Sequence, residues 1–466
     1  MTSYTQRFRW LLVLAGIILL GWFLRPWFHG FVMVVYTTPA VIEVIIAWVI
    51  GIGIFRRVTS SEERQLLKRL LFDQRDDSTR QRQLFAFLFS RPTATFVLLA
   101  ALLLGTAPLI LAGPYSQVHI ANNLAVESTS ELPEINATQP RVLPKSVAQE
   151  YASNSLQFPR YQLAAGDIAL RNGRPTWTFG LAPDGTINNF LLTGKGAVFV
   201  DMTTQQKRVN VVQDDPRVSF GLGLFQGKGV ISTYRWHLIK NKFFATYKDP
   251  ITIEHNNRIY MAVPYRTYGF HWRWTPPPMP YTTPEWGGVA LIHPDGKTVH
   301  LDPEAARNNP VLEEQRLFPF DLARHYVQAQ RYQRGILNKW FIHEDELELA
   351  PIPGEKNRQP FLAVTKQQGL QYFVAAEPYG NAQGIYQIWL FDGRTGNIRK
   401  FQLPVESALT GPRQAADFVR KSNSQTDWDR FEPSEPVPAV LNGTLFWQVR
   451  VVPSDSSGIA YTAFVN

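Results

Sequence analysis

The chain has 466 residues, of which 45% are hydrophobic and 18% are charged, and it contains no cysteine. This composition is typical of a globular protein with added membrane segments, and the absence of thiols excludes disulfides, thiolate metal sites and cysteine nucleophiles. The net charge is +9, and the first 115 residues hold 12 Lys and Arg against 6 Asp and Glu. Because this excess borders apolar segments, we expect it to orient the chain in a membrane and expect no nucleic-acid partner.

Three apolar stretches predict membrane-spanning helices: residues 10–24, 31–55 and 93–113. The second is long enough to cross a hydrocarbon core of roughly 30 Å at about 1.5 Å per residue. Arg25-Pro26-Trp27 follows the first stretch in place of the small residues of a signal-peptide cleavage site, so we expect this helix to be retained. The sequence thus predicts a three-helix anchor over residues 1–115.

The loop between the second and third stretches, residues 56–91, holds nine Lys and Arg and five Asp and Glu. The positive-inside rule places this loop and the N-terminus in the cytoplasm, residues 25–30 in a tight outer turn, and everything after about residue 115 outside. A capping sequence at residues 59–63 precedes four leucines and predicts a surface helix within the loop; these are Leu66, Leu67, Leu70 and Leu71.

Glu43 lies in the middle of the second predicted span. An ionised carboxyl there costs on the order of 3 kcal/mol or more, so it is a candidate intramembrane contact. Three interpretations stay open: a proton or ion path, a partner helix that offers a cation, or a protonated Glu that bonds to Thr37, Thr38 or nearby backbone.

The stretch QIWLFDGRTGNIRKF contains an Asp followed by Thr-Gly, like the phosphorylated Asp-Lys-Thr-Gly loop of cation-pumping ATPases. That loop requires Lys and a second Thr where Gly393 and Asn397 stand, and the site would face away from cytoplasmic ATP. Period-two alternation on both sides of a polar break instead predicts a β-hairpin with Asp392 in its turn. Hairpins of this layout are predicted at residues 194–212, 288–302 and 385–403.

The residues around the first hairpin carry a family resemblance. A helix at 143–156 precedes the strands RYQLAAGDIALRNGRPTWTFGLAP and GAVFVDMTTQQKRV, and this order resembles a PepSY domain, whose hallmark is a strand ending in Asp before Thr-Gly. A second copy resembles it at 411–466, with Asn466 where the Asp should stand, so we expect a natural continuation to be missing from this sequence. The resemblance implies a cystatin-like module outside the membrane, in some members a restraint on peptidases, and it supplies no catalytic residue.

The sequence therefore predicts an α+β ectodomain of antiparallel sheets with packed helices. Its expected parts are a linker (116–142), a first PepSY-like unit (143–215), a central α+β region (216–405) and a second, truncated unit (406–466). In the central region, residues 229–239 are expected to form a strand and residues 303–342 to be mostly helical.

Residues 265–288 hold the densest aromatic run, interrupted by prolines. These side chains suit contact with a protein, a membrane surface or a sugar, whereas a Pro-rich loop that folds its aromatics onto its own sheet is the plain structural alternative. The candidate contact residues are Tyr268, Phe270, His271, Trp272, Trp274, Tyr281 and Trp286.

Motifs for catalysis and cofactors are weak. His293 and His300 flank a predicted hairpin and, with His271, form the one site we could name for an envelope enzyme. The glycine-rich residues 221–232 lack the spacing of a phosphate-binding loop. We therefore expect no cofactor and no catalysis, but a prokaryotic-type envelope protein that binds or scaffolds another membrane or envelope protein. An accessory subunit of a transport or enzyme complex, using Glu43, and a peptidase-modulating protein are the alternatives.

Overall fold

The structure is a computed structural model. It describes residues 2–466 except 63–64, 66–67, 69–91, 216–232, 275–277, 353–358, 367–368, 381–383 and 404–408. Two compact units are present, which we call the sheet unit and the helix unit. The sheet unit comprises Met1–His29, Ile120–Thr267 and Pro284–Asn466, and the helix unit comprises Gly30–His119 and Tyr268–Thr283.

The N-terminal helices differ from the predicted three spans. Helix α1 (Thr2–Thr37) runs without interruption through residues 25–30, so the predicted outer turn is wrong, and Pro26 is accommodated inside the helix. Helix α2 (Ala40–Val58) follows after a short break, and α5 (Pro92–Asn123) continues past the predicted end of the third span into the predicted linker. In the described part of the chain, Leu12–Thr37 and Thr95–Asn123 are long and apolar enough to cross a membrane.

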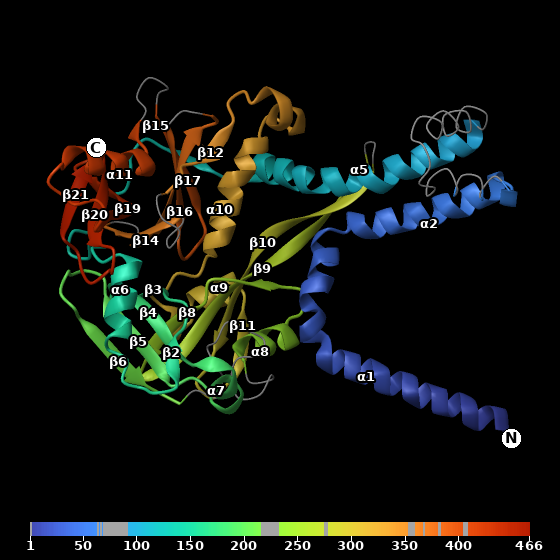
Figure 1. The fold of residues 1–466 in the computed structure, drawn as a ribbon, viewed down its shortest axis with the longest axis horizontal. Coiled ribbons are helices and arrows are strands. Elements are labelled where there is room, and N and C mark those ends of the chain that lie inside the picture. The colour runs from blue at the N-terminus through green and yellow to red at the C-terminus, as the bar shows by residue number, and fades with distance from the viewer. Residues whose placement is uncertain are drawn as a thin grey trace. The chain divides into compact units, whose positions relative to one another are not determined.

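Helix α2 carries more charged residues than these two segments, because Glu43, Arg56 and Arg57 lie within its 19 residues. The predicted surface helix after it lies largely outside the described residues, and the glycine-rich stretch 221–232 lies entirely outside them. The coarse prediction of a helical N-terminus followed by a large sheet-rich α+β region is confirmed (Figure 1).

Within the helix unit, α2 and α5 pack against each other through small residues. A side chain at Gly51 would collide with Ala101, and one at Gly105 would collide with the Trp48 indole, while Ala40 and Ala112 are both buried in one apolar cluster. These contacts run in opposite directions along the two helices, so α2 and α5 form an antiparallel pair. Small residues at the contact allow this close approach, as in membrane helix pairs.

The sheet unit contains three copies of one supersecondary motif, a helix followed by an antiparallel sheet (Figure 1). Repeat one consists of α6 (Lys145–Ser153), β3 (Asp167–Arg171), β4 (Arg174–Pro183), β5 (Gly196–Asp201) and β6 (Val209–Gln213). Repeat two consists of α10 (Phe320–Ala329), β13 (Phe361–Thr365), β14 (Gly369–Pro378), β16 (Gln387–Asp392) and β17 (Ile398–Gln402). Repeat three consists of α11 (Pro412–Ser422), β19 (Phe431–Leu441), β20 (Thr444–Pro453) and β21 (Tyr461–Val465).

The strand registers show that the three repeats are equivalent. In repeat one, Trp177 pairs with Ile168 and with Val200, the residue before Asp201. In repeat two, Tyr372 pairs with Leu362 and with Phe391, the residue before Asp392. In repeat three, Trp447 pairs with Pro438 and with Val465, the residue before Asn466.

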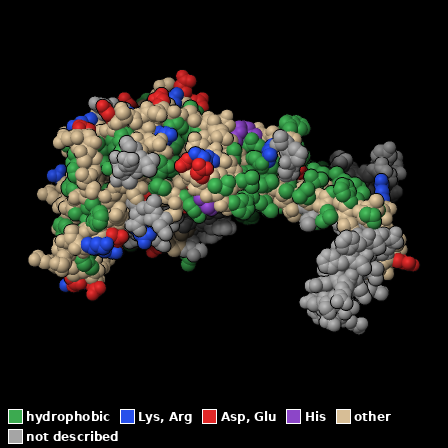
Figure 2. All heavy atoms as spheres, turned by 90° about the horizontal axis from the view of Figure 1, so that it is seen from above, with side chains coloured by type: hydrophobic (Ala, Val, Ile, Leu, Met, Phe, Trp, Pro, Cys, Tyr) green, Lys and Arg blue, Asp and Glu red, His purple; other side chains and the backbone are tan. Residues whose placement is uncertain are grey.

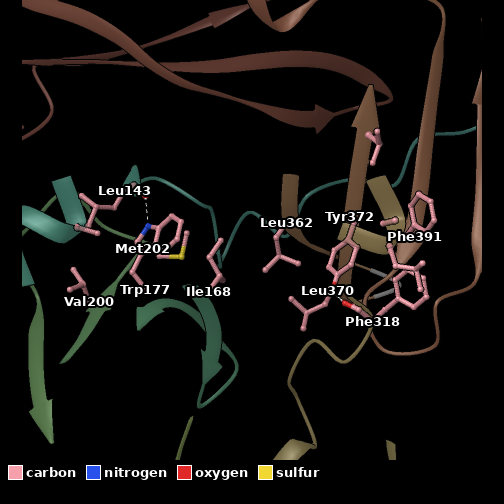
Figure 3. Packing of buried hydrophobic residues seen from close by; sticks show 14 of the residues in the cluster. Leu143, Ile168, Trp177, Val200, Met202, Phe318, Leu362, Leu370, Tyr372 and Phe391 are labelled. Carbon is pink, nitrogen blue, oxygen red and sulfur yellow. Dashed lines mark hydrogen bonds between the residues drawn. The ribbon is translucent and has the colours of Figure 1, made fainter. Parts of the chain in front are cut away.

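An aromatic residue at the equivalent position of each repeat donates a hydrogen bond to the backbone just before the repeat's helix. Trp177 donates its indole N–H to the Leu143 carbonyl at 3.0 Å, Tyr372 donates its hydroxyl to the Phe318 carbonyl at 2.6 Å, and Trp447 donates to the Thr410 carbonyl at 2.6 Å. Each of these carbonyls lies two residues before the first residue of the repeat's helix. Figure 3 shows the first two of these aromatic side chains among their apolar neighbours.

A buried arginine joins repeat three to the segment that precedes α6. The Arg450 side chain is fully buried and donates to the carbonyl oxygens of Arg141, Val142 and Glu435. Arg141 in turn pairs with Glu435 at 3.0 Å, with both side chains buried. Charge-assisted bonds of this kind are strong where water is excluded, so they fix the two repeats together.

The remaining strands complete the sheets. Strand β1 (Glu127–Thr129) pairs parallel with β17, β12 (Leu347–Leu349) with β14, β2 (Tyr161–Leu163) with β4, and β15 (Gly384–Ile385) with β18 (Leu409–Thr410). A separate sheet has the order β11-β10-β9-β7, with β8 on β9. Its strands are β7 (Thr246–Tyr247), β8 (Ile251–His255), β9 (Arg258–Arg273), β10 (Met279–Ile292) and β11 (Thr298–Leu301).

Three further findings bear on the predictions. The hairpins at 194–212, 288–302 and 385–403 are confirmed as β5–β6, β10–β11 and β16–β17. The predicted strand at 229–239 is wrong in its described part, because Thr233 caps helix α8 (Tyr234–Asn241) by accepting from the Trp236 N–H. The other helical segments are α7 (Gly185–Leu191), α9 (Pro303–Arg307), η2 (Pro310–Leu312), η3 (Gln330–Tyr332) and η4 (Asn338–Ile342).

Candidate functional site

Six of the seven predicted contact residues lie at the far end of the β9–β10 hairpin, in the helix unit; Trp286 is the exception. The sequence predicts contact by a Pro-rich segment, but apart from Trp274 these positions belong to two long strands. Successive side chains of a strand point to opposite faces, which separates His271 from Phe270 and Trp272. Tyr268 shares the face of Phe270 but lies against the end of α1, so the run separates by its contacts into a packed and an exposed set.

One set holds the hairpin against α5 and the end of α1. His271 Nε2 lies 2.8 Å from Thr283 Oγ1, and its ring is stacked on Tyr281 and adjacent to His119, with ring centroids 4.1 Å apart. The Tyr281 hydroxyl lies 3.2 Å from His119 Nδ1. Tyr268 meets the Tyr36 ring edge-on at 6.1 Å. These aromatics therefore serve packing between the hairpin and the helices.

Hydrogen bonds to the backbone reinforce this packing. Ser116 Oγ on α5 donates to the Thr282 carbonyl at 2.6 Å, and Thr282 Oγ1 donates to the Thr37 carbonyl at 2.7 Å. The Arg273 guanidinium lies 3.7 Å from the centre of the Tyr115 ring. The hairpin end is thus tied to α5 and to the end of α1.

The other set faces outward. Phe270, Trp272 and Trp274 are 62%, 43% and 82% exposed, and the two Trp rings contact each other with centroids 5.6 Å apart. We call these three residues the aromatic row. Hydrophobic side chains also gather over the helical part of the molecule in Figure 2. An exposed apolar surface of this kind makes the aromatic row a candidate interaction site.

Trp286 does not belong to this site. It lies in the sheet unit, where its ring meets Phe318 edge-on at 5.5 Å and its N–H donates to the Gly288 carbonyl at 3.2 Å. It therefore has a packing role.

Glu43 occupies the first turn of α2, because α1 ends at Thr37 and a new helix begins at Ala40. A helix N-terminus favours a carboxylate, so its position is less costly than the middle of a continuous span. Its Oε2 atom is nevertheless buried, with no hydrogen-bond partner among the described residues.

The three candidate histidines of an enzyme site are dispersed. His300 Nε2 lies 2.9 Å from the Tyr247 hydroxyl, and burial lowers the His300 pKa to about 4, with Lys242 adding to the effect. His293 instead packs against Tyr260. His271 belongs to the helix unit. Within the described residues, no group of three or more His, Asp or Glu could hold a metal ion.

A charged cavity of about 250 Å³ lies between repeats one and two. Lys145 and Phe320, the first residues of α6 and α10, both line it, and so do Asp167 and Asp321. Burial raises the pKa of both carboxyls, opposed by Arg316 at Asp167 and by Arg266 at Asp321. Because each carboxylate has its own arginine partner, this cluster fits a role in joining the repeats.

A second exposed apolar surface is one that the sequence did not point to. Leu337, Trp340, Phe341 and Ile342, in and beside η4, are 68%, 38%, 74% and 65% exposed. We call these four residues the loop patch. The sequence predicts only a mostly helical segment at 303–342, and nothing in the spacing of these four residues predicts their exposure.

The loop patch is held by a buried ion network. Glu346 is almost fully buried and accepts bonds from Arg331 at 2.9 Å, Lys339 at 2.8 Å and His343 at 2.6 Å. These bonds lower the Glu346 pKa, although burial alone would raise it. The His343 ring also stacks on Tyr379, with centroids 4.2 Å apart. The backbone that carries the patch is therefore rigidly placed.

Comparison of the chain with protein-family models, with curated proteins and with solved structures found no match. The resemblance to PepSY domains therefore stays a prediction, and function must be argued from the residues and their geometry.

Proposed function

We propose that the protein is a non-enzymatic, membrane-anchored scaffold whose extracytoplasmic sheet unit binds another envelope protein through the loop patch. The observation that carries the proposal is the combination of four exposed apolar side chains with the ion network around Glu346. A rigid patch loses little conformational entropy on binding, and clusters with Trp and other large side chains dominate protein interfaces.

The membrane part of the proposal is supported by two apolar helices and by contacts of α1. Arg25 donates to the Lys240 carbonyl, and His29 Nε2 lies 3.1 Å from the Ala245 carbonyl. Residues 25–29 thus pack within the sheet unit, so we place the part of α1 that crosses the membrane before Arg25. With α2 as a further crossing between α1 and α5, the basic loop 56–91 lies in the cytoplasm and the sheet unit outside.

Site-specific photocrosslinking tests the binding proposal. A photoreactive phenylalanine analogue replaces Phe341 in one variant and Ile187 in a control, since both side chains are 74% exposed. In native membranes we expect one discrete protein adduct from position 341 and none from position 187. Leu337→Ser combined with Trp340→Ser should remove that adduct. Identical adduct patterns at 341 and 187, or none at 341, would overturn the proposal.

Glu43 supports a second candidate, an accessory subunit of a transport assembly. Its buried, unpartnered Oε2 favours a cationic group on a neighbouring helix of another subunit. Glu43→Gln should then weaken the assembly in mild detergent and lower its transport activity. An assembly and activity unchanged by this substitution exclude the transport role.

A further inference from the structure

The β9–β10 hairpin runs along α5 with a definite order of contacts. His271 and Tyr281 lie at the level of His119, and Arg273 lies at the level of Tyr115. Met279 is buried with Ala112 and Ala40. From His119 to Ala112 a helix rises about 10 Å, so the hairpin end follows α5 over this length.

These levels coincide with the end of an apolar segment. Ala112 closes the apolar run of α5 that includes the exposed side chains of Leu103, Leu109 and Ile110, whereas Tyr115, Ser116 and His119 are polar or amphipathic. If α5 crosses the bilayer, Ala112 lies near the hydrocarbon boundary and His119 among the headgroups. The hairpin end therefore reaches the same boundary.

The two faces of β9 fit a position at the membrane boundary. The inner face places His271 and Arg273 against α5. The outer face carries the aromatic row, whose side chains are exposed, as are those of Leu109 and Ile110 on α5. Trp is enriched where membrane and water meet, because its ring is apolar and its N–H remains hydrated or bonded to headgroups.

We infer that the aromatic row is an interfacial membrane anchor, in which Phe270, Trp272 and Trp274 insert among the lipids of the outer leaflet beside α5. Main-chain groups of a hairpin end can remain hydrated in the headgroup layer, whereas they could not in the hydrocarbon core. The anchor adds an attachment beside the helices that cross the membrane and limits tilting of the hairpin relative to the bilayer. The inference rests on the membrane anchoring stated under the proposed function, but not on the loop patch.

Because the chain has no cysteine, single labels can be placed cleanly. Trp272→Cys, Trp274→Cys, Leu103→Cys and Ile187→Cys each carry an environment-sensitive fluorophore, in full-length protein reconstituted into phosphatidylcholine and phosphatidylglycerol vesicles. Lipids with spin labels near the headgroup or deep in the acyl chain act as quenchers, and iodide reports exposure to water. Leu103 serves as the reference within α5, and Ile187 as the reference for an exposed apolar side chain of the sheet unit.

We expect labels at 272 and 274 to be blue-shifted and quenched most by the shallow spin label, with little quenching by iodide. Position 103 should respond most to the deep spin label, and position 187 to iodide alone. If 103 responds to lipid while 272 and 274 behave like 187, the inference fails and the helical anchor stands. If 103 also fails to respond to lipid, both the inference and the membrane anchoring fail, while crosslinking at the loop patch tests partner binding separately.

Discussion

Removing the hydroxyl of Tyr372 tests the repeat architecture of the sheet unit. The Tyr372 side chain is fully buried, and its hydroxyl donates to the Phe318 carbonyl at 2.6 Å, two residues before α10. Burial raises the Tyr372 pKa, so the hydroxyl remains a donor throughout the usual pH range. Tyr372→Phe keeps the ring but leaves a buried carbonyl without this donor, and we expect a loss of about 1–3 kcal/mol in unfolding free energy.

The assay is urea unfolding of the full-length protein in detergent, followed by near-ultraviolet circular dichroism. Tyr379→Phe is the matched control, because the Tyr379 ring is 42% exposed and stacks on His343 without depending on its hydroxyl. The control should change the unfolding free energy by less than about 0.5 kcal/mol. Equal effects of the two substitutions would refute the idea that this bond fastens the helix of repeat two.

Three further substitutions test other contacts. Arg450→Met should lower the unfolding free energy by about 3–5 kcal/mol in urea unfolding. The substitution removes a buried positive charge near Glu435 and also the donors to the carbonyls that precede α6. A loss below about 1 kcal/mol would contradict this. Gly105→Leu should separate α2 from α5 and lower the thermal stability in detergent, whereas an unchanged melting temperature would show that Trp48 does not pack there. Burial and Glu348 raise the pKa of Glu377 from 4.5 to about 7, although Arg413 opposes them. The folded protein therefore holds this proton longer than the unfolded chain, so stability falls as pH rises from about 4.5 to about 7, by at most about 3 kcal/mol. Glu377→Gln should remove that decline, and identical pH profiles of variant and parent would contradict it.

The sequence predicted local structure well where turn chemistry was explicit. Asp392 accepts from the backbone N–H groups of Arg394 and Thr395, as expected of a turn Asp, and the Asp201 carboxylate does the same for Thr203. These side-chain bonds depend on residues close in sequence, so a single sequence contains the information. The second repeat was missed because residues 330–360 separate α10 from β13, and the helix and sheet become neighbours through long-range packing alone.

Exposure was harder to predict than secondary structure. Period-two alternation cannot state which face of a strand is covered, so Phe270 on β9 and Trp286 on β10 looked equivalent, although Trp286 packs on Phe318 and Phe270 is exposed. The outer turn at residues 25–30 was expected because these residues separate two apolar stretches that the positive-inside rule orients in opposite directions. Contacts of Arg25 and His29 with the backbone of residues 240 and 245 accompany a continuous helix there instead.

Cysteine labelling in cells tests the placement of the sheet unit outside the membrane most directly. Ser457→Cys lies at an exposed position of the sheet unit, and Ser60→Cys lies just after α2, beside the basic loop. After any outer barrier has been made permeable, a maleimide that cannot cross the cell membrane should label position 457 in intact cells and position 60 only after lysis. Labelling of position 60 but not position 457 in intact cells would contradict the account.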